Sequence, residues 1–128
     1  MSRGTSRCKP CDVQQARQRL VDARQFLEAA DLLDAPDVVA TNAIHAAIAA
    51  ADAITCNALG ERSSEGNHVS AVDLLRQVDA SSATALKRAV DRKTQASYES
   101  VDISRSDAAK CVTWARRLVA VAQTRLEA

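Results

Sequence analysis

The sequence predicts an all-α protein, an up-and-down bundle of about five helices that are mostly antiparallel. Apolar residues recur at spacings of three and four over most of the chain, and no stretch shows the alternation of a strand. Apolar residues make up 47% of the chain but aromatic residues only 2%, because much of the apolar fraction is Ala. Since Ala buries little area, such a core depends on close helix approach and gains from self-association, so we expect a homodimer.

The first helix is expected over residues 12 to 33, with Asp12 as its N-cap. Pro36 ends it, because proline cannot continue a helix and forces Ala35 out of the α region. A heptad seam, typical of helices packed at shallow angles, runs along Val13, Ala16, Leu20, Ala23, Leu27 and Ala30.

The second helix, over residues 37 to 59, is apolar on nearly every side, which predicts a place in the middle of the bundle. Its few polar residues share one stripe and need partners from other helices, because an unpaired buried polar group costs roughly 1–3 kcal/mol. That stripe is Thr41, His45, Asp52 and Thr55. We interpret His45 as a core or interface histidine. Gly60 follows in the position that ends many helices.

Three further helices follow the polar loop "GERSSEGNH". The third is expected over about 68 to 79 and the fourth over about 82 to 97. Ser104 starts the fifth, with Asp107 completing a variant of the capping box. Trp114, the one large anchor of this helix, is expected at a helix–helix or dimer contact.

Length and composition indicate one domain over residues 12–128, preceded by a disordered or frayed tail over residues 1–11. The net charge of +1 gives no general attraction to nucleic acid or membrane. The N-terminus lacks a secretory signal, and we see no run of about 18 apolar residues, so we expect a cytoplasmic protein that does not contact membranes. With three glycines in the chain, a nucleotide cradle is excluded and no cofactor is expected.

Four cysteines carry no strong metal signal. Cys8 and Cys11 have the CxxC spacing, but no second pair or spaced histidines complete a zinc set, so no metal is predicted. We interpret the pair as part of the frayed tail, with an opportunistic disulfide or a metal shared between subunits as the alternatives. Cys56 and Cys111 lie in apolar helices and are interpreted as small hydrophobic residues.

The order of these segments resembles the HEPN domains of prokaryotes. A long amphipathic helix is followed by the small-residue helix "NAIHAAIAAADAI", a loop ending in a histidine before "AVDLL", then "LKRAVDRKTQASY" and a closing helix rich in Ala and Val. The resemblance runs from Asp12 to Leu126 and rests on helix order and apolar texture. It implies a small helical bundle, usually a dimer. Many HEPN domains are ribonucleases, often toxins paired with a nucleotidyltransferase-like antitoxin.

The active motif of that family is an arginine followed, after four to six residues, by a histidine, with two such pairs facing each other across the dimer cleft. The arginine corresponds to Arg92, but Ser97 and Tyr98 stand where the histidine is expected. Histidine moves protons near neutral pH because its pKa is about 6.5, whereas tyrosine, with a pKa of about 10, is a poor base. The candidate catalytic residues are therefore Arg92, Tyr98 and, as a substitute histidine, His68. Otherwise His68 caps the third helix or packs at its edge, and Tyr98 is a helix-end residue whose ring covers the core.

Two functions fit the sequence. In the first, the chain is a nucleic-acid-associated protein, a toxin-like ribonuclease or a degenerate member that still binds RNA, whose phosphates contact the basic residues of the fourth helix. These are Lys87, Arg88, Arg92 and Lys93. In the second, it is a non-catalytic helical dimerisation or interaction module that partners a neighbouring gene product, and the same residues form a solvated face. The missing histidine and the small net charge favour the second.

Overall fold

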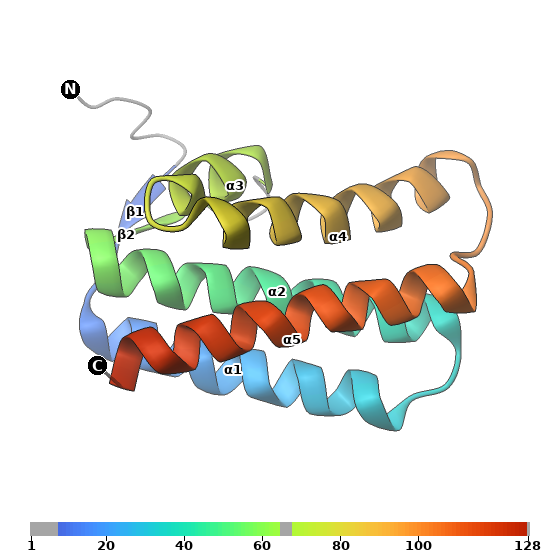
Figure 1. The fold of residues 1–128 in the computed structure, drawn as a ribbon, viewed down its shortest axis with the longest axis horizontal. Helices are drawn as coiled ribbons and strands as arrows, with labels where there is room; N and C mark the ends of the chain where they lie inside the picture. The colour runs from blue at the N-terminus through green and yellow to red at the C-terminus, as the bar shows by residue number, and fades with distance from the viewer. Residues whose placement is uncertain (1–7, 65–67, 128) are drawn as a thin grey trace.

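The computed structural model describes residues 8–64 and 68–127 as five helices packed against each other, with one small two-stranded sheet (Figure 1). The elements are β1 (Cys8–Pro10), α1 (Val13–Leu32), α2 (Pro36–Leu59), β2 (Glu61–Ser63), α3 (His68–Arg76), α4 (Ala80–Tyr98) and α5 (Arg105–Glu127). The predicted all-α bundle is confirmed. The sheet was not predicted, because strands of three residues are too short to show an alternating pattern.

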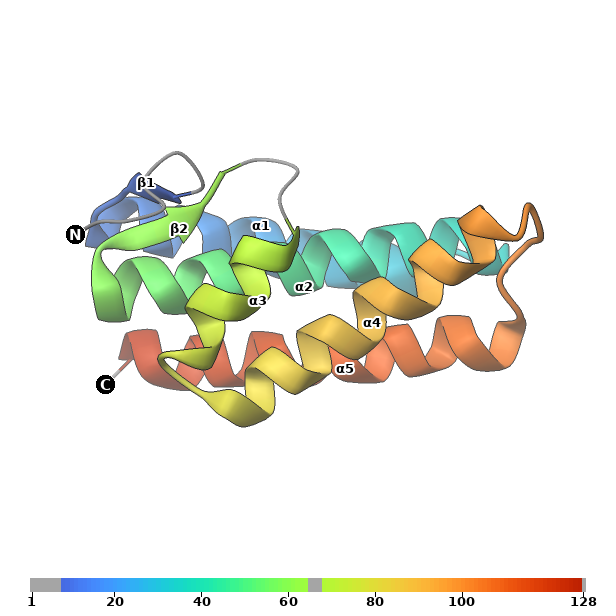
Figure 2. The ribbon, with the colours of Figure 1, turned by 90° about the horizontal axis from the view of Figure 1, so that it is seen from above.

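Helix α2 lies in the middle of the bundle, as its sequence predicts. Helices α1 and α5 lie on one side of it, and α4 with the short α3 on the other (Figures 1 and 2). Thirteen of its 24 residues are buried, and eight of those are alanines. Because an alanine side chain ends at Cβ, neighbouring backbones approach α2 closely from several directions.

Helix α2 is also long and apolar enough to cross a membrane by length and composition, with a mean hydropathy of 1.4 over its best window. Polar residues interrupt its apolar run, so the expectation that the chain does not contact membranes stays a prediction. The core helix of a soluble protein passes the same test, and here 67% of that window is buried inside the bundle.

The ends of the helices follow local rules. Asp12 caps α1 as predicted: its carboxylate accepts from the backbone N–H of Gln15 at 2.8 Å, and the Gln15 side chain accepts from Asp12 N–H at 2.9 Å. At α5 the Ser104 hydroxyl accepts from the N–H of Asp107 at 3.0 Å. Along α1, every residue of the predicted seam is buried except Val13, which lies in the first turn and is 46% exposed.

The segment from Cys8 to Cys11, expected in a frayed tail, is instead attached to the bundle. Cys11 forms a disulfide with Cys56, with the two Cα atoms 5.5 Å apart. The backbone N–H of Cys11 donates to the carbonyl of Gly60 at 2.9 Å. Strand β1 pairs antiparallel with β2, which places Cys8 opposite Ser63. Residues 1–7 of the expected tail lie outside the described residues.

The interpretation of Cys56 as only a small hydrophobic residue was therefore wrong. The pairing arises because α1 and α2 form an antiparallel hairpin of two long helices, which brings the start of α1 beside the end of α2. Gly60 then turns the chain out of α2 with a φ of +71°, a left-handed conformation that glycine adopts without a steric penalty. Cys111, in contrast, is a buried free thiol, as expected of a small core residue.

The disulfide makes a testable contribution to stability. In a Cys8→Ser background, which prevents rearrangement, we expect Cys11→Ser to lower the free energy of unfolding by about 2–4 kcal/mol, because the bond closes a loop of 45 residues in the unfolded chain. Urea denaturation followed by circular dichroism measures this difference. The control is Cys8→Ser alone, which replaces a half-buried free cysteine. It should change the free energy of unfolding by no more than about 0.5 kcal/mol. Equal stability with and without Cys11 would mean that the bond contributes nothing.

Candidate functional site

Arg92, the counterpart of the HEPN motif arginine, is held against α5. Its Nη1 lies 2.8 Å from Oδ1 of Asp107, and its guanidinium carbon lies 5.8 Å from the centre of a Trp114 ring. A cation over an indole face is attracted by the ring quadrupole, so the two contacts fix the guanidinium from two sides. Lys110 contacts the same Asp107 oxygen at 3.8 Å. Arg92 is thus an ordered cation on the seam between α4 and α5.

The other two candidate catalytic residues lie elsewhere. Tyr98 is the last residue of α4, and 89% of its surface is exposed. His68 begins α3, is exposed, and lines a cavity of about 170 Å³ between α3 and α4, together with Lys87 and Asp91. Arg92 lines a different cavity, under the α4–α5 turn. Within the described part of one chain, the structure does not bring Arg92, Tyr98 and His68 into one site.

The predicted basic residues of α4 divide into two kinds. Lys87 pairs with Asp91 at 2.7 Å, and Lys93 with Asp37 of α2 at 3.2 Å, so neither charge is free. Arg88 is exposed, and among the described residues no carboxylate lies within 4 Å of it. The predicted basic patch on α4 therefore carries less unpaired positive charge than its four cationic residues suggest.

Helix α5 adds cations that the sequence interpretation missed. Lys110, Trp114 and Arg117 follow one another at spacings of four and three, so they share one side of α5. Arg88 stands one turn from Arg92 on α4, and Arg92 covers Trp114. We call the surface formed by Arg88, Arg92, Lys110, Trp114 and Arg117 the α4–α5 basic face. The spacing on α5 was readable in the sequence, but the contact with α4 was not.

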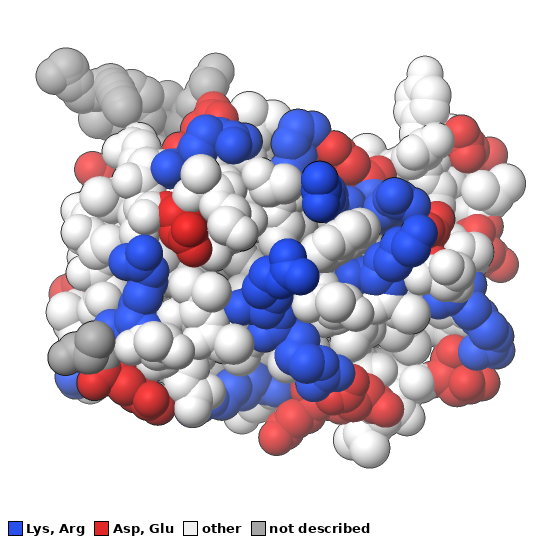
Figure 3. Space-filling model, in the orientation of Figure 1, with Lys and Arg blue, Asp and Glu red and all other residues white. Residues whose placement is uncertain are grey.

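Figure 3 shows Lys and Arg side chains gathered over this side of the molecule, with most acidic side chains toward its edges. Arg117, like Arg88, is exposed and has no carboxylate partner within 4 Å among the residues that the structure describes. Asp107, which is half-buried, is the acid that contacts Arg92 and Lys110. The face is therefore locally cationic even though the whole chain is close to neutral.

The polar stripe of α2 has a structural role. Asp52 is buried, and its Oδ2 lies 3.0 Å from Nη2 of Arg19 on α1 and 3.8 Å from Nη1 of Arg62 on β2. Burial raises the pKa of the Asp52 carboxyl, because the loss of water outweighs the two arginines that lower it. The expectation that this residue needs partners from other elements is confirmed.

The remaining stripe residues behave differently. Thr41 and Thr55 donate to carbonyls of their own helix, those of Asp37 at 2.9 Å and Asp52 at 3.4 Å. His45 is exposed, so it is not a core histidine, and the alternative that it lies at an interface stays a prediction. Its ring stacks on Phe26 of α1, with the centroids 5.1 Å apart, because the stripe turns out of the core toward the first half of α2.

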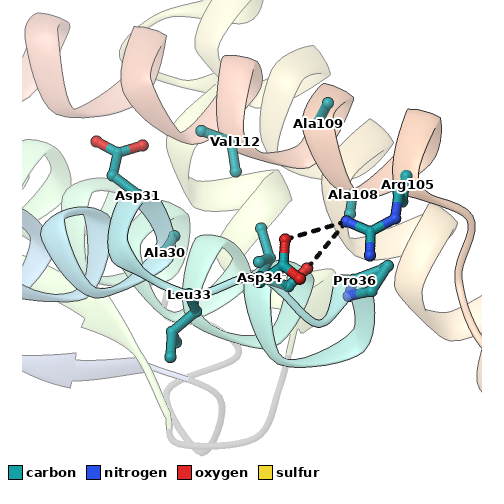
Figure 4. A pocket seen from close by; sticks show the side chains of 10 residues that line it. Ala30, Asp31, Leu33, Asp34, Pro36, Arg105, Ala108, Ala109 and Val112 are labelled. Atoms are coloured by element: carbon teal, nitrogen blue, oxygen red, sulfur yellow. Dashed lines mark hydrogen bonds and ion pairs between the residues drawn. The ribbon is translucent and has the colours of Figure 1, made fainter.

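A further hollow of about 300 Å³ lies where the α1–α2 turn meets the start of α5 (Figure 4). Arg105 closes one side by contacting Asp34 at 3.3 Å. The other residues that line the hollow are largely apolar and include Pro36 and Val112. Leu33, on the turn, also lines the hollow and is 43% exposed, and Leu32, the last residue of α1, is 87% exposed.

Over residues 8–64 and 68–127, no three His, Cys, Asp or Glu side chains gather as a metal site would require. No protein-family model, curated protein or solved structure matches this chain. Its function is therefore inferred from its own residues.

The buried carboxylate gives a pH-dependent prediction. Because folding raises the pKa of Asp52 above its ordinary value of 3.8, the folded state binds more protons than the unfolded state between the ordinary and the raised pKa. The contribution of Asp52 to the free energy of unfolding therefore decreases as pH rises through that window. We expect the stability of the wild type relative to Asp52→Asn to decrease over the same range.

Urea denaturation at pH 4 to 7 and constant ionic strength measures that difference. Asp22→Asn is the matched control, since Asp22 also contacts Arg19, at 3.1 Å, but is more exposed. A stability difference that grows with pH would show instead that Arg19 and Arg62 outweigh the cost of burial.

Proposed function

We propose that this chain is a HEPN-like nucleic-acid-associated protein that binds RNA through the α4–α5 basic face and does not cleave it. The observation that supports this proposal most is a pair of exposed arginines, Arg88 and Arg117, beside the ordered Arg92 and Trp114. Neither has a carboxylate partner within the described residues. Arginine presents a planar fork of donors that matches a phosphate group. Contacts of this kind supply most of the affinity of nucleic-acid binding that does not depend on sequence.

The contacts of Arg92 support a positioning role on that face. Its Nη1 donates to Asp107, which leaves other N–H groups of the guanidinium free to contact a phosphate. Asp107 and Trp114 also restrain the side chain before any ligand arrives, so less conformational entropy is lost on binding. Arg88 and Arg117 then contribute charge that no carboxylate of residues 8–64 and 68–127 neutralises.

Binding without cleavage follows from the positions of the proton-transfer groups. Metal-independent cleavage requires one group that accepts the proton of the ribose 2′-hydroxyl and another that protonates the leaving oxygen. His68 lines the cavity beside Lys87 rather than the one that Arg92 lines, and Tyr98 projects into solvent. A phosphate held by Arg92 therefore has no histidine of the same chain beside it.

The HEPN resemblance adds three elements to this proposal: a homodimer, a nucleotidyltransferase-like antitoxin as partner, and a cytoplasmic location. A symmetric dimer doubles the number of α4–α5 basic faces available to one RNA molecule. An antitoxin would act by covering one of them.

RNA binding is tested with a short single-stranded RNA whose affinity is measured by fluorescence anisotropy across a range of salt concentrations. We expect the affinity to fall steeply with salt, because each phosphate contact releases counterions. The double variant Arg88→Ala/Arg117→Ala should bind at least about tenfold more weakly, which corresponds to about 1.4 kcal/mol. Its slope of log affinity against log salt should also be smaller by roughly 1.4, or about 0.7 for each lost contact.

The matched control is Arg17→Ala/Arg76→Ala, which removes two exposed arginines from α1 and α3. That variant loses the same net charge, so it should retain most of the affinity if the α4–α5 basic face is the site. Equal losses in the two double variants would show that only the total charge matters and would rule out this face.

The absence of cleavage is tested by incubating the purified protein with total RNA in a metal chelator and examining fragment lengths. We expect the wild type and Arg92→Ala to give the same pattern as buffer, because the groups that would move protons lie apart. Fragments that appear with the wild type and disappear in Arg92→Ala or Tyr98→Phe would overturn this part of the proposal and indicate a ribonuclease.

A second candidate function is a non-catalytic interaction module for a neighbouring gene product. It is favoured by the α1–α2 turn, where Leu33, 43% exposed, lines the hollow together with Pro36 and Val112. The salt titration separates the two functions, because a module of this kind leaves RNA unbound at every salt concentration.

A further inference from the structure

Three cysteines lie at one end of the bundle, although the sequence placed only two of them together. Cys11 and Cys56 are joined, and Cys8 is a free thiol on β1, half-buried, three residues before Cys11. Cys11 is the more exposed residue of the bond, since it is half-buried and Cys56 is only 2% exposed. The CxxC pair and the disulfide thus share one sulfur atom.

The β ladder holds the CxxC pair apart. Residues 8–10 are extended and pair with β2, so that Cys8 lies opposite Ser63. Three residue steps of extended chain span up to about 10 Å, whereas the Cα atoms of a disulfide lie at most about 7 Å apart. Cys8 therefore reaches the sulfur of Cys11 only after β1 has left β2. A ladder this short is a weak restraint, because an isolated two-stranded ribbon is marginally stable.

We propose that Cys8, Cys11 and Cys56 form a thiol–disulfide exchange switch, in which the bond moves from Cys11–Cys56 to Cys8–Cys11 when β1 separates from β2. The thiolate of Cys8 attacks Sγ of Cys11, and a new Cys8–Cys11 bond forms as the Cys11–Cys56 bond breaks. The electron pair of the broken bond leaves on Sγ of Cys56, which takes up from solvent a proton equivalent to the one that Cys8 released. No oxidant or reductant is consumed.

The switch alters how the two ends of the α1–α2 hairpin are joined. In the closed state the disulfide and the Cys11–Gly60 hydrogen bond attach the segment before α1 to the end of α2. In the open state that covalent link is gone, and β2 loses its paired strand. Arg62 lies on β2, so the open state also loosens one of the two arginines that contact Asp52.

Cys111 provides an internal control. It is fully buried on α5, where its Sγ lies 3.7 Å from the carbonyl oxygen of Ala89, and burial raises the pKa of its thiol to about 11. It becomes reactive only when the bundle opens. Labelling of Cys111 therefore reports global unfolding, whereas a Cys8–Cys11 bond reports opening of the switch.

The full chain is incubated without reductant at increasing urea concentrations and quenched with acid, and its disulfides are then mapped by mass spectrometry. In parallel samples, a brief pulse of iodoacetamide labels the exposed thiols. We expect the Cys8–Cys11 bond to replace Cys11–Cys56 at urea concentrations where Cys111 is still unlabelled. The exchange rate should rise roughly tenfold for each pH unit below about 8, because the thiolate is the attacking species.

Cys8→Ser is the matched control, since it removes the attacking thiol and leaves the disulfide in place. It should keep the Cys11–Cys56 bond and release no Cys56 thiol in the same urea range. The proposal is overturned if the wild type forms the Cys8–Cys11 bond only together with Cys111 labelling or never forms it, if its rate is independent of pH, or if Cys8→Ser releases Cys56 equally well.

Discussion

The rest of the structure depends on the burial of α2, a helix whose sides are mostly alanine. A central helix with large side chains would hold its neighbours at a distance and leave gaps between them. Eight of the buried residues of α2 are alanines, so α1, α5 and α4 all pack directly against it. Larger residues such as Leu20, Leu86 and Leu118 then come from the surrounding helices and fill the space between them. The two buried polar residues of α2, Asp52 and Thr55, are tolerated because each has a partner within reach.

One end of α2 carries most of the polar and covalent contacts. Asp52 lies one turn before Cys56, so the ion pairs with Arg19 and Arg62 and the bond to Cys11 occupy the same stretch of the helix. Burying a carboxylate is costly unless it is paired, and here the partners come from two different elements. This end is therefore held by specific interactions, while the middle of the helix is held by close packing. The α4–α5 basic face lies on other helices and does not share these contacts.

The sequence was informative where a pattern belongs to one helix and weak where two helices must meet. The seam from Ala16 to Ala30 and the cap at Asp12 are periodic or local features, and both are present as expected. The Cys11–Cys56 bond depends on how long α1 and α2 are and on how their ends align, which no spacing in the sequence encodes. The same holds for Arg92: its position on α4 was predicted, but its contacts with Asp107 and Trp114 depend on the packing of α5. The core alternative for His45 was wrong because the polar stripe of α2 leaves the core along its length.

The Cys11–Cys56 bond turns part of the backbone into a ring. It links residues 45 apart in sequence, so α1, the α1–α2 turn and nearly all of α2 lie within a closed covalent loop. The exposed turn around Leu32 and Asp34 lies inside that loop. A protease that cuts there would break the peptide chain without separating the two fragments. They would migrate together in denaturing gel electrophoresis until a reducing agent cleaved the disulfide. A cut in the turn between α4 and α5, outside the loop, would leave two pieces held together by packing alone.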